Sequence, residues 1–330
     1  MSDKAKYGLL SYRNTGNIGD EIQSLAARQF LPQVDYFIDR EELNQFSLGK
    51  DERVWTILNG WYCHKPENWP PSNEIVPLLV SLHISKQPSI FSGLSPVDAM
   101  LSEPAAHYLR GVGPVGARDQ QTLRLLQGAG IDSYFSGCLT LTLQRPPVDR
   151  EEDLIVVCDT LDSTFDFVRK STTKRVERVS HVAFHNPQAD ARFQFAESLL
   201  RLYARASCVV TTRLHCALPC VAMGTPVFLI DMAPDQDRFS GLHDFVRHAP
   251  IWIFNEGRSG FNIDNPGANP DAHLPYRKAL TKRATSFVRS AVEGQIPGEP
   301  LSTEQRLQVA NLTVSRLARA VSEKQRAAHS

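Results

Sequence analysis

One stretch, Cys208–Ile230 (CVVTTRLHCALPCVAMGTPVFLI), limits the possible fold of this chain more than any other. It opens with a β-branched run typical of a buried strand, and apolar residues then recur at helical spacing from about residue 213. Gly224 is a natural helix stop, and a second apolar strand begins at Val227. Such a strand–helix–strand unit places its two strands parallel in one sheet. We therefore expect an α/β protein built on parallel sheets.

The turn between this strand and this helix carries Arg213 and His215. Ligands of open parallel sheets bind beyond the carboxyl ends of the strands, and a helix N-terminus favours anions. Arg213 can hold a carboxylate or phosphate through two hydrogen bonds, and His215 titrates near neutral pH. The alternative is structural, with Arg213 paired to a nearby acid and His215 packed in the core. Because both residues occur together at one turn, we favour a binding role.

The length of 330 residues predicts about two domains, each with a sizeable core. Residues 144–153 (QRPPVDREED) are rich in proline and charge, as domain linkers are. We expect an N-terminal Rossmann-like domain over 1–145, a C-terminal one over 151–296 and a final helix over 302–328. Ligand is then expected in a cleft between the facing strand ends.

The overall charge and the cysteines exclude several classes of protein. Net charge is zero and the pI is about 7.1, so no general attraction to nucleic acid is expected. No apolar run reaches the ~20 residues that span a bilayer, and the N-terminus lacks the apolar core of a signal peptide. The six cysteines form no CxxC pair, which favours buried free thiols in a reducing cytoplasm. Cys216 and Cys220 share a helix face without a second pair of ligands, so we predict no metal site.

A glycine-rich loop over 13–20 (RNTGNIGD) lies between a predicted first strand over 7–12 and a first helix over 21–30. Such turns bring backbone close to a ligand in α/β proteins. The loop is not a GxGxxG motif, so it gives a dinucleotide little support. Asp20 is either the N-cap of the helix or a ligand-facing carboxylate, and the sequence alone favours the cap.

Three further positions in the first half follow predicted strands. Trp61 and Tyr62 come just past a strand over 54–58, where aromatic rings either stack on a sugar or plug a loop into the core. His83 follows the next strand, over 76–82. Arg118 sits at a strand-to-helix junction, and alone it would more often form a surface ion pair; Asp119 is the expected N-cap of the helix over 120–127.

The remaining elements follow from the same periodicities. Strands are expected over 34–38, 134–142, 154–158, 176–184 and 251–254, and helices over 96–109, 192–205, 276–292 and 302–328.

The sequence resembles the polysaccharide pyruvyl transferases along most of its length. The resemblance is carried by NTGNIGDEIQ, VGARDQQTLRLL, YFSGCLTLTL and the segment from ARFQFAESLL to GTPVFLI. The RLH tripeptide followed by GTP is its most specific part. The resemblance implies a fold like the two-Rossmann GT-B glycosyltransferases. It also implies an enzyme that uses phosphoenolpyruvate to place a pyruvate ketal on a sugar of a surface glycan precursor.

The resemblance also implies roles for individual residues. The RLH of the donor site falls on Arg213, Leu214 and His215, the arginine of an RD motif on Arg118, and a GD motif on Gly19 and Asp20. The expected catalytic residues are His215, Arg213 and Asp20, and the expected donor contacts are Arg118, Arg213, Leu214 and His215. The expected acceptor contacts, placed on the first domain's side, are Asn17, Gly19, Asp20, Trp61, Tyr62 and His83.

The implied chemistry needs an acid, a base and cations for carboxylate and phosphate, but no cofactor and no metal. The expected partners are phosphoenolpyruvate and a saccharide or lipid-linked saccharide, with the enzyme in the cytoplasm at the inner face of the membrane. Two alternatives stay open. A nucleotide-sugar glycosyltransferase of the same fold would bind a diphosphate with the same arginine and helix end, and a glycan-binding protein without activity is the other.

Overall fold

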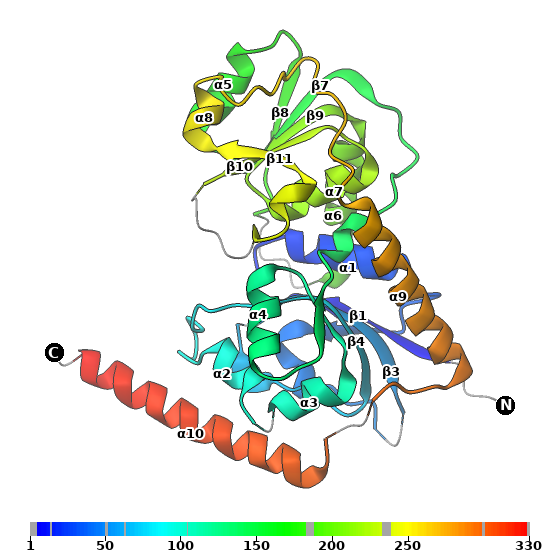
Figure 1. The fold of residues 1–330 in the computed structure, drawn as a ribbon, viewed down its shortest axis with the longest axis vertical. Helices are drawn as coiled ribbons and strands as arrows, with labels where there is room; N and C mark the ends of the chain where they lie inside the picture. The colour runs from blue at the N-terminus through cyan, green and yellow to red at the C-terminus, as the bar shows by residue number, and fades with distance from the viewer. Residues whose placement is uncertain are drawn as a thin grey trace. The chain divides into compact units, whose positions relative to one another are not determined.

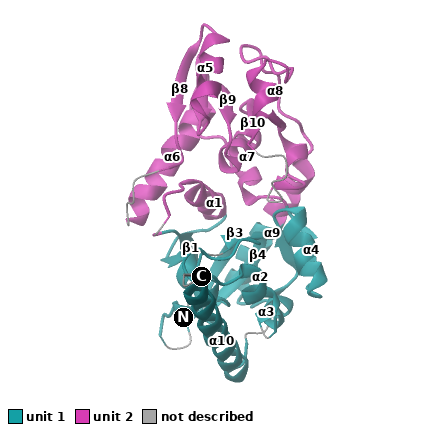
Figure 2. Cartoon of the chain, turned by 90° about the vertical axis from the view of Figure 1, so that its left-hand side faces the viewer, with its two compact units in different colours: residues 1–12, 30–136, 283–330 teal, residues 13–29, 137–282 magenta. Residues whose placement is uncertain are grey.

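The computed structural model describes residues 5–13, 15–49, 52–62, 64–103, 105–182, 188–232, 239–298 and 301–328. It divides into two compact units (Figure 2). Unit 1 contains Met1–Tyr12, Phe30–Ser136 and Arg283–Ser330, and unit 2 contains Arg13–Gln29 and Gly137–Lys282.

This division differs from the expected domain ranges in three places. Residues 13–29 belong to unit 2, the break falls after Ser136 instead of within 144–153, and residues 283–296 belong to unit 1. The first helix, α1 (Gly19–Arg28), packs against α6 (Ala189–Arg205) and α7 (Leu214–Met223). A buried ion pair between Glu21 and Arg192 joins α1 to α6. These packing contacts assign α1 to unit 2. The prediction missed them because it relied on the composition of the linker, which carries no information about packing.

Unit 1 is built on a six-stranded parallel sheet in the order β2-β1-β3-β4-β5-β6 (Figure 1). Its strands are β1 (Lys6–Ser11), β2 (Tyr36–Asp39), β3 (Val54–Tyr62), β4 (Ile75–Ile84), β5 (Val115–Ala117) and β6 (Ser133–Phe135). Its helices are α2 (Pro96–Leu101), α3 (Ala105–Val112), α4 (Gln120–Gly128) and α10 (Thr303–Ala328), with 3-10 turns η1 (Arg40–Gln45) and η2 (Pro66–Asn68).

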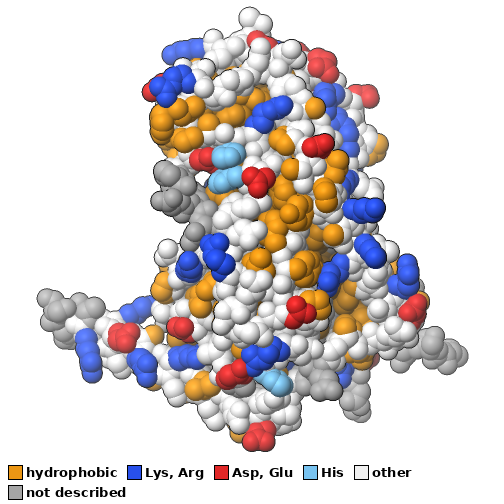
Figure 3. Space-filling view, viewed as in Figure 1, with side chains coloured by type: hydrophobic (Ala, Val, Ile, Leu, Met, Phe, Trp, Pro, Cys, Tyr) orange, Lys and Arg blue, Asp and Glu red, His pale blue; other side chains and the backbone are white. Residues whose placement is uncertain are grey.

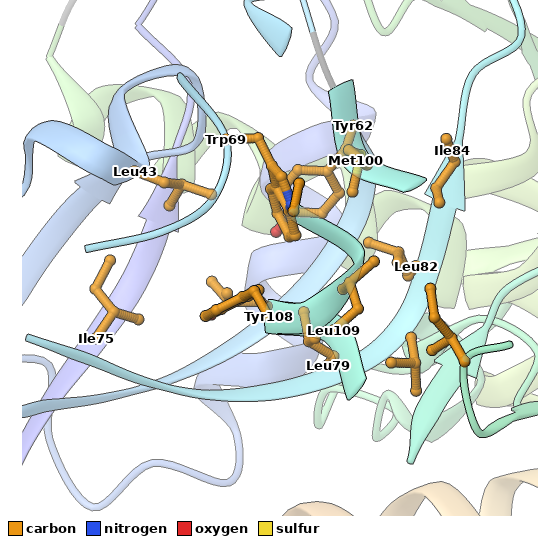
Figure 4. Close-up of a cluster of buried hydrophobic side chains, with 14 of the residues drawn as sticks. Leu43, Tyr62, Trp69, Ile75, Leu79, Leu82, Ile84, Met100, Tyr108 and Leu109 are labelled. Atoms are coloured by element: carbon orange, nitrogen blue, oxygen red, sulfur yellow. The ribbon is translucent and has the colours of Figure 1, made fainter. Parts of the chain in front are cut away.

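The core of unit 1 is organised around three aromatic rings (Figure 4). Trp69 meets the edge of Tyr62 on one side and of Tyr108 on the other, and each pair has centroids 5.7 Å apart. Edge-to-face packing of this kind adds specific attraction to the burial of large apolar surfaces. Aliphatic residues of β4 and α3, including Leu79 and Leu109, fill the space around the rings.

Unit 2 is built on a five-stranded parallel sheet in the order β11-β10-β9-β7-β8. Its strands are β7 (Glu151–Cys158), β8 (Arg175–Val179), β9 (Ala206–Thr211), β10 (Val227–Asp231) and β11 (Arg247–Pro250). Its helices, besides α1, α6 and α7, are α5 (Asp162–Lys170) and α8 (Ile251–Asn255), with 3-10 turns η3 (Leu139–Thr142) and η5 (His243–Phe245). Residues of α9 (Leu274–Glu293) belong to both units.

The expected fold class is confirmed, because each unit contains a parallel sheet with helical crossovers. The parallel pairing of β9 with β10 and the left-handed C-cap at Gly224, with φ of 73°, are as predicted. The predicted final helix is also confirmed, and the Oγ of Ser302 accepts a hydrogen bond from the amide of Gln305. Pro219 is accommodated inside α7.

Several predicted elements were wrong in type or extent. Residues 251–254 form helix α8, and the neighbouring strand is β11; short apolar runs do not distinguish strand from helix. The strand expected over 134–142 stops at Phe135 and gives way to a 3-10 turn. The helix expected over 96–109 is two helices, and its Pro104 lies outside the described residues. The strand expected over 176–184 ends at Val179, and residues 183–184 are also outside them.

Two sequence expectations concern the whole chain. Within the described ranges, no helix combines the length and apolar character required to cross a membrane. Five cysteines are buried free thiols, as expected, and Cys63 lies outside the described residues.

Candidate functional site

The turn between β9 and α7 places Arg213 and His215 at the carboxyl edge of the unit 2 sheet. Arg213 is the N-cap residue of α7 in extended conformation, and its amide donates to Thr211 Oγ1 over 2.9 Å. His215 is the second residue of the helix and is half-buried, whereas Leu214 is buried. The first backbone amides of α7 belong to the same short turn. The turn therefore offers an anion both the guanidinium of Arg213 and free backbone N–H donors.

Asp159 anchors the guanidinium of Arg213. It follows β7, the neighbour of β9 in the sheet, and its Oδ2 accepts a hydrogen bond from Arg213 Nε over 2.7 Å. The same carboxylate accepts from Ser180 Oγ and from the amide of His181. Burial acts to raise the pKa of Asp159, but these hydrogen bonds and the Arg213 charge outweigh it and lower that pKa.

Sequence reasoning missed Asp159. The signal was present, because Asp159 comes directly after a predicted apolar strand, as Arg213 does. Its backbone is unusual for a residue other than glycine, with φ of 52°. Non-glycine residues in this left-handed region store strain and concentrate at functional sites.

The pairing with Asp159 uses only one nitrogen of Arg213. Among the described residues, Nε is the only side-chain atom of Arg213 that makes a hydrogen bond. A guanidinium has five N–H donors, and its two terminal nitrogens match the two oxygens of a carboxylate or phosphate. The side chain is 37% exposed. Arg213 therefore pairs with an acid, as the structural alternative expected. This pairing leaves its two terminal nitrogens for an anion.

The loop before α1 lies against this turn. Asn17 forms an antiparallel bridge with Val182, and the amide of Ile18 donates to the carbonyl of His181 over 2.8 Å. A methyl group on Gly19 would lie 3.2 Å from His215 Cβ and from His181 Nδ1. The structure thus brings Gly19 and His215 together within unit 2, whereas we expected the loop on the first domain's side.

Asn17 and Asp20 differ in what they do at the start of α1. The N-cap position is Ile18, so the N-cap interpretation of Asp20 was wrong. Asn17 Oδ1 instead accepts from the amide of Gly19 over 3.2 Å. Asp20 is the second helical residue, is buried, and accepts from Gln23 Nε2. A carboxylate there is stabilised by the helix dipole.

A second group of candidate residues lies in unit 1, at the ends of β4 and β5. Leu82 and Ala117 are register partners, so His83 and Arg118 follow neighbouring positions of adjacent strands. Asp119 Oδ2 lies 2.6 Å from His83 Nδ1 and 3.7 Å from Arg118 Nε. As predicted, Asp119 is also the N-cap of α4, where its Oδ1 accepts from the amide of Thr122 over 2.9 Å.

The charges of this group are buried. The Arg118 side chain is 3% exposed, and its Nε has no hydrogen-bond partner among the described residues. Burial acts to raise the pKa of Asp119, but its contacts with His83 and Arg118 outweigh it and lower that pKa. A buried guanidinium with an unsatisfied donor is suited to an anionic ligand.

Trp61 and Tyr62 have different environments because β3 extends through both of them. Successive side chains of a strand point to opposite faces. Tyr62 is 0% exposed and lies in the unit 1 core, so we no longer expect it to contact an acceptor. Trp61 is half-buried and is the register partner of His83, which places both side chains on one face of the sheet. His83 itself lies within β4, not after it.

Among the residues of unit 2 that the structure describes, two groups of side chains have the composition of metal sites: Cys158, His181 and Cys216, and Asp231, His243 and His248. The first group is fully buried, and His181 Nε2 lies 2.8 Å from the hydroxyl of Tyr203. The hydrogen bond to Cys216 and burial raise the pKa of Cys158, and burial raises that of Cys216. Without a bound ion, the two thiols are therefore neutral at pH 7.

Comparison with known proteins identifies a matching family and distant similarities to solved structures, which include the two below. The model of the family described as polysaccharide pyruvyl transferase matches residues 17–234. A protein of uncharacterised function from Klebsiella pneumoniae is 12% identical with a TM-score of 0.42, over 71% of this chain and 86% of that one. The wall teichoic acid polymerase TagF is 9% identical with a TM-score of 0.37, over 97% and 91%. No curated protein sequence matches.

Proposed function

Because the chain belongs to the polysaccharide pyruvyl transferase family, we propose that it transfers pyruvate from phosphoenolpyruvate to a sugar of a glycan or glycolipid precursor, forming a ketal and releasing phosphate. The observation that carries the proposal is the Arg213 side chain. It is tethered through Nε to Asp159 at the N-terminus of α7, two residues before His215, whose Cβ lies close to Gly19. All of these residues lie within the matched segment.

The donor has a carboxylate and a phosphate, and the proposed contacts follow from those charges. Arg213 holds one anionic group through its terminal nitrogens, and the first amides of α7 add donors beside it. Arg118 is the second proposed contact of phosphoenolpyruvate, because its guanidinium is buried and its Nε is unsatisfied. Fixed donors of this kind stabilise the negative charge of the leaving phosphate.

The proposed reaction has two additions to one carbon. His215 delivers a proton to the methylene carbon of phosphoenolpyruvate, while a sugar hydroxyl oxygen bonds to the adjacent carbon and loses its proton to a base. The bond from that carbon to the phosphate oxygen then breaks, and phosphate leaves with the bonding electron pair. A second sugar hydroxyl oxygen bonds to the same carbon and closes the ketal ring, and its proton returns to His215. Asp20 is the proposed base, since it is the carboxylate that follows Gly19 in the first turn of α1, and Gly19 closely approaches His215. The acceptor is proposed to be lipid-linked, which would bring the enzyme to the inner face of the membrane.

Donor preference tests the assignment. The melting temperature should rise with phosphoenolpyruvate and not with UDP-sugars, since only a ligand that binds the folded state stabilises it. Arg213→Ala should abolish most of that rise, and Arg213→Lys should restore little, because an ammonium cannot make the two-pronged contact. Stabilisation by UDP-sugars alone would instead identify a glycosyltransferase. Binding of glycans with no response to either donor would identify a binding protein.

The role of His215 is tested separately by His215→Gln, which keeps a hydrogen-bonding side chain but cannot transfer a proton. Phosphate release from phosphoenolpyruvate, measured with a panel of saccharide acceptors, should fall by roughly 10²–10⁴ in kcat while donor affinity stays within about tenfold. A variant with near-normal kcat and a raised KM for phosphoenolpyruvate would show that His215 only binds phosphate.

A further inference from the structure

A second group of polar side chains converges in unit 2, where Asp231 ends β10, His248 lies in the neighbouring strand β11, and His243 opens η5. Asp231 Oδ2 lies 2.7 Å from His248 Nδ1, and Oδ1 lies 3.2 Å from His243 Nε2. The two imidazole rings stack with centroids 4.2 Å apart and planes 13° apart. Figure 3 shows such a pair of histidine side chains on the surface, with acidic side chains next to them.

The contact between Asp231 and His243 does not have the geometry of a hydrogen bond. Oδ1 and Nε2 are both buried, and neither has a hydrogen-bond partner among the described residues, although they are 3.2 Å apart. At that distance the donor direction must be oblique to the line between the two atoms. Two atoms that bind one metal ion have this relationship, because each points at the ion and not at the other.

The separations also fit a shared ion. Ligands at 2.0–2.2 Å from Zn²⁺, with angles of 90–109° between them, are roughly 2.8–3.6 Å apart. The two observed separations of 2.7 and 3.2 Å bracket the lower end of that range, so only a small opening of the Asp231–His248 contact is required. One carboxylate with two imidazoles is a common donor set for first-row transition metals.

All three side chains come from well-anchored elements. The register of β10 with β11 relates Asp231 to His248, since Leu229 pairs with His248 and Asp231 with Pro250. Leu242, which precedes η5, and Phe245, its last residue, are both buried, which holds His243 in position. A site whose ligands are held by packed neighbours loses little entropy when it binds an ion.

The local charge and exposure also favour a cation. The charge of Asp244 acts on His248 in addition to that of Asp231. The nearest arginine along β11, Arg247, donates its guanidinium to backbone carbonyls of residues 266–268. The three side chains are partly exposed, which leaves a path from solvent and space for further ligands. The exposed fraction is 11% for Asp231, 28% for His243 and 36% for His248.

We propose that Asp231, His243 and His248 bind a divalent transition-metal ion, of which Zn²⁺ is the physiological candidate, with at least one position open to water or an anionic oxygen. Asp231 ends the strand next to β9, so the ion lies on the same sheet as the Arg213 turn. The proposal goes beyond the pyruvyl transfer, whose steps need no metal. From the sequence we predicted no metal site after considering the pair Cys216 and Cys220, and Asp231, His243 and His248 were not among the candidate ligands.

The test uses full-length protein without a polyhistidine tag, stripped with EDTA and dialysed, and titrates it with Zn²⁺ by calorimetry. Wild-type protein should bind one equivalent. Asp231→Asn and His248→Gln should each weaken binding by at least about tenfold, since losing a ligand costs no less than losing a ligand's outer partner. His107→Gln, at an exposed position on α3, is the matched control and should bind as wild type does.

Replacing Zn²⁺ with Co²⁺ identifies the ligands even if a variant fails to fold. The wild-type Co²⁺ protein should show visible d–d bands without the near-ultraviolet thiolate charge-transfer band that Cys158 or Cys216 would produce. Retention of that spectrum in Cys216→Ala would support the proposal further. Absence of Zn²⁺ binding by wild-type protein, unchanged binding in both Asp231→Asn and His248→Gln, or a thiolate band would overturn it. In those cases the three residues form an imidazolium–carboxylate network only.

Discussion

Asp159 and Arg213 are joined by a hydrogen bond of 2.7 Å between Oδ2 and Nε. Because the bond uses Nε, Asp159 fixes the guanidinium without occupying its terminal nitrogens. The carboxylate is itself held by Ser180 and by the amide of His181, and the residue adopts a φ of 52°. Asp159 is therefore a positioning residue for the proposed donor contact.

Asp159→Asn should weaken phosphoenolpyruvate binding by about tenfold, since it removes the charge from a hydrogen bond to an ionised partner. Calorimetric titration of the donor measures this effect. Asp162→Asn is a matched control, because Asp162 pairs with Arg178 at an exposed position of the same unit. We expect that control to bind the donor as wild type does. Equal affinity in Asp159→Asn and wild type would remove Asp159 from the site.

Gly19→Ala should impair the proposed site, because the added methyl group would meet Asn17 Oδ1 at 3.1 Å and His215 Cβ and His181 Nδ1 at 3.2 Å. Admitting the methyl group requires these neighbours to move by a few tenths of an ångström, which displaces the loop or His215. We expect a lower kcat as well, measured by phosphate release. In α4, Gly128→Ala introduces a methyl group with no atom within 4 Å and should be neutral or slightly stabilising. Normal kcat in Gly19→Ala would show that the close approach is not needed.

Asp119→Asn should destabilise the protein by about 3 kcal/mol at pH 7, because it leaves the buried Arg118 without its counter-charge while the amide oxygen still caps α4. The pKa of Asp119 is lowered in the folded state, so the unfolded chain takes up the proton first as pH falls. The stability that the carboxylate contributes is therefore complete above its ordinary pKa of about 4 and is lost below it. Denaturant unfolding at pH 7, 4 and 3 should show wild type and variant converging in acid.

The control for this pH dependence is Asp98→Asn, at an exposed position in α2, which should change stability by less than about 0.5 kcal/mol. A stability difference between wild type and Asp119→Asn that stays constant from pH 7 to pH 3 would contradict the ion-pair interpretation.

Trp61→Ala and Tyr62→Ala should have different consequences although the residues are adjacent: the first should affect the acceptor KM and the second the stability. Tyr62 lies in the aromatic core with Trp69, so its truncation should cost about 3–5 kcal/mol in the free energy of unfolding. Trp61 is half-buried beside His83, and its truncation should raise acceptor KM more than donor KM. Unfolding curves and steady-state kinetics separate the two effects. A large loss of stability in Trp61→Ala, with equal changes in both KM values, would show that Trp61 is a core residue.

The sequence by itself determined the local units of this protein. The apolar runs of this segment, together with Gly224, predicted β9, α7 and β10 and their parallel pairing, because strand and helix periods and the residues that stop them are local properties. The same pattern placed Arg213 and His215 at one turn. Asp119 was predicted as the cap of α4 for the same reason, since a cap and its helix are only a few residues apart.

Only the tertiary structure decided which of these units meet. Asp159 and Arg213 are 54 residues apart, and they are joined because β7 and β9 are neighbours in the sheet. The loop before α1 reaches His215 because α1 packs on α6 and α7, although its sequence lies in the first tenth of the chain. The convergence of Asp231, His243 and His248 likewise depends on strand order and on the register of β10 with β11. Strand order and helix packing arise from contacts between distant segments, which the period of a single segment does not encode.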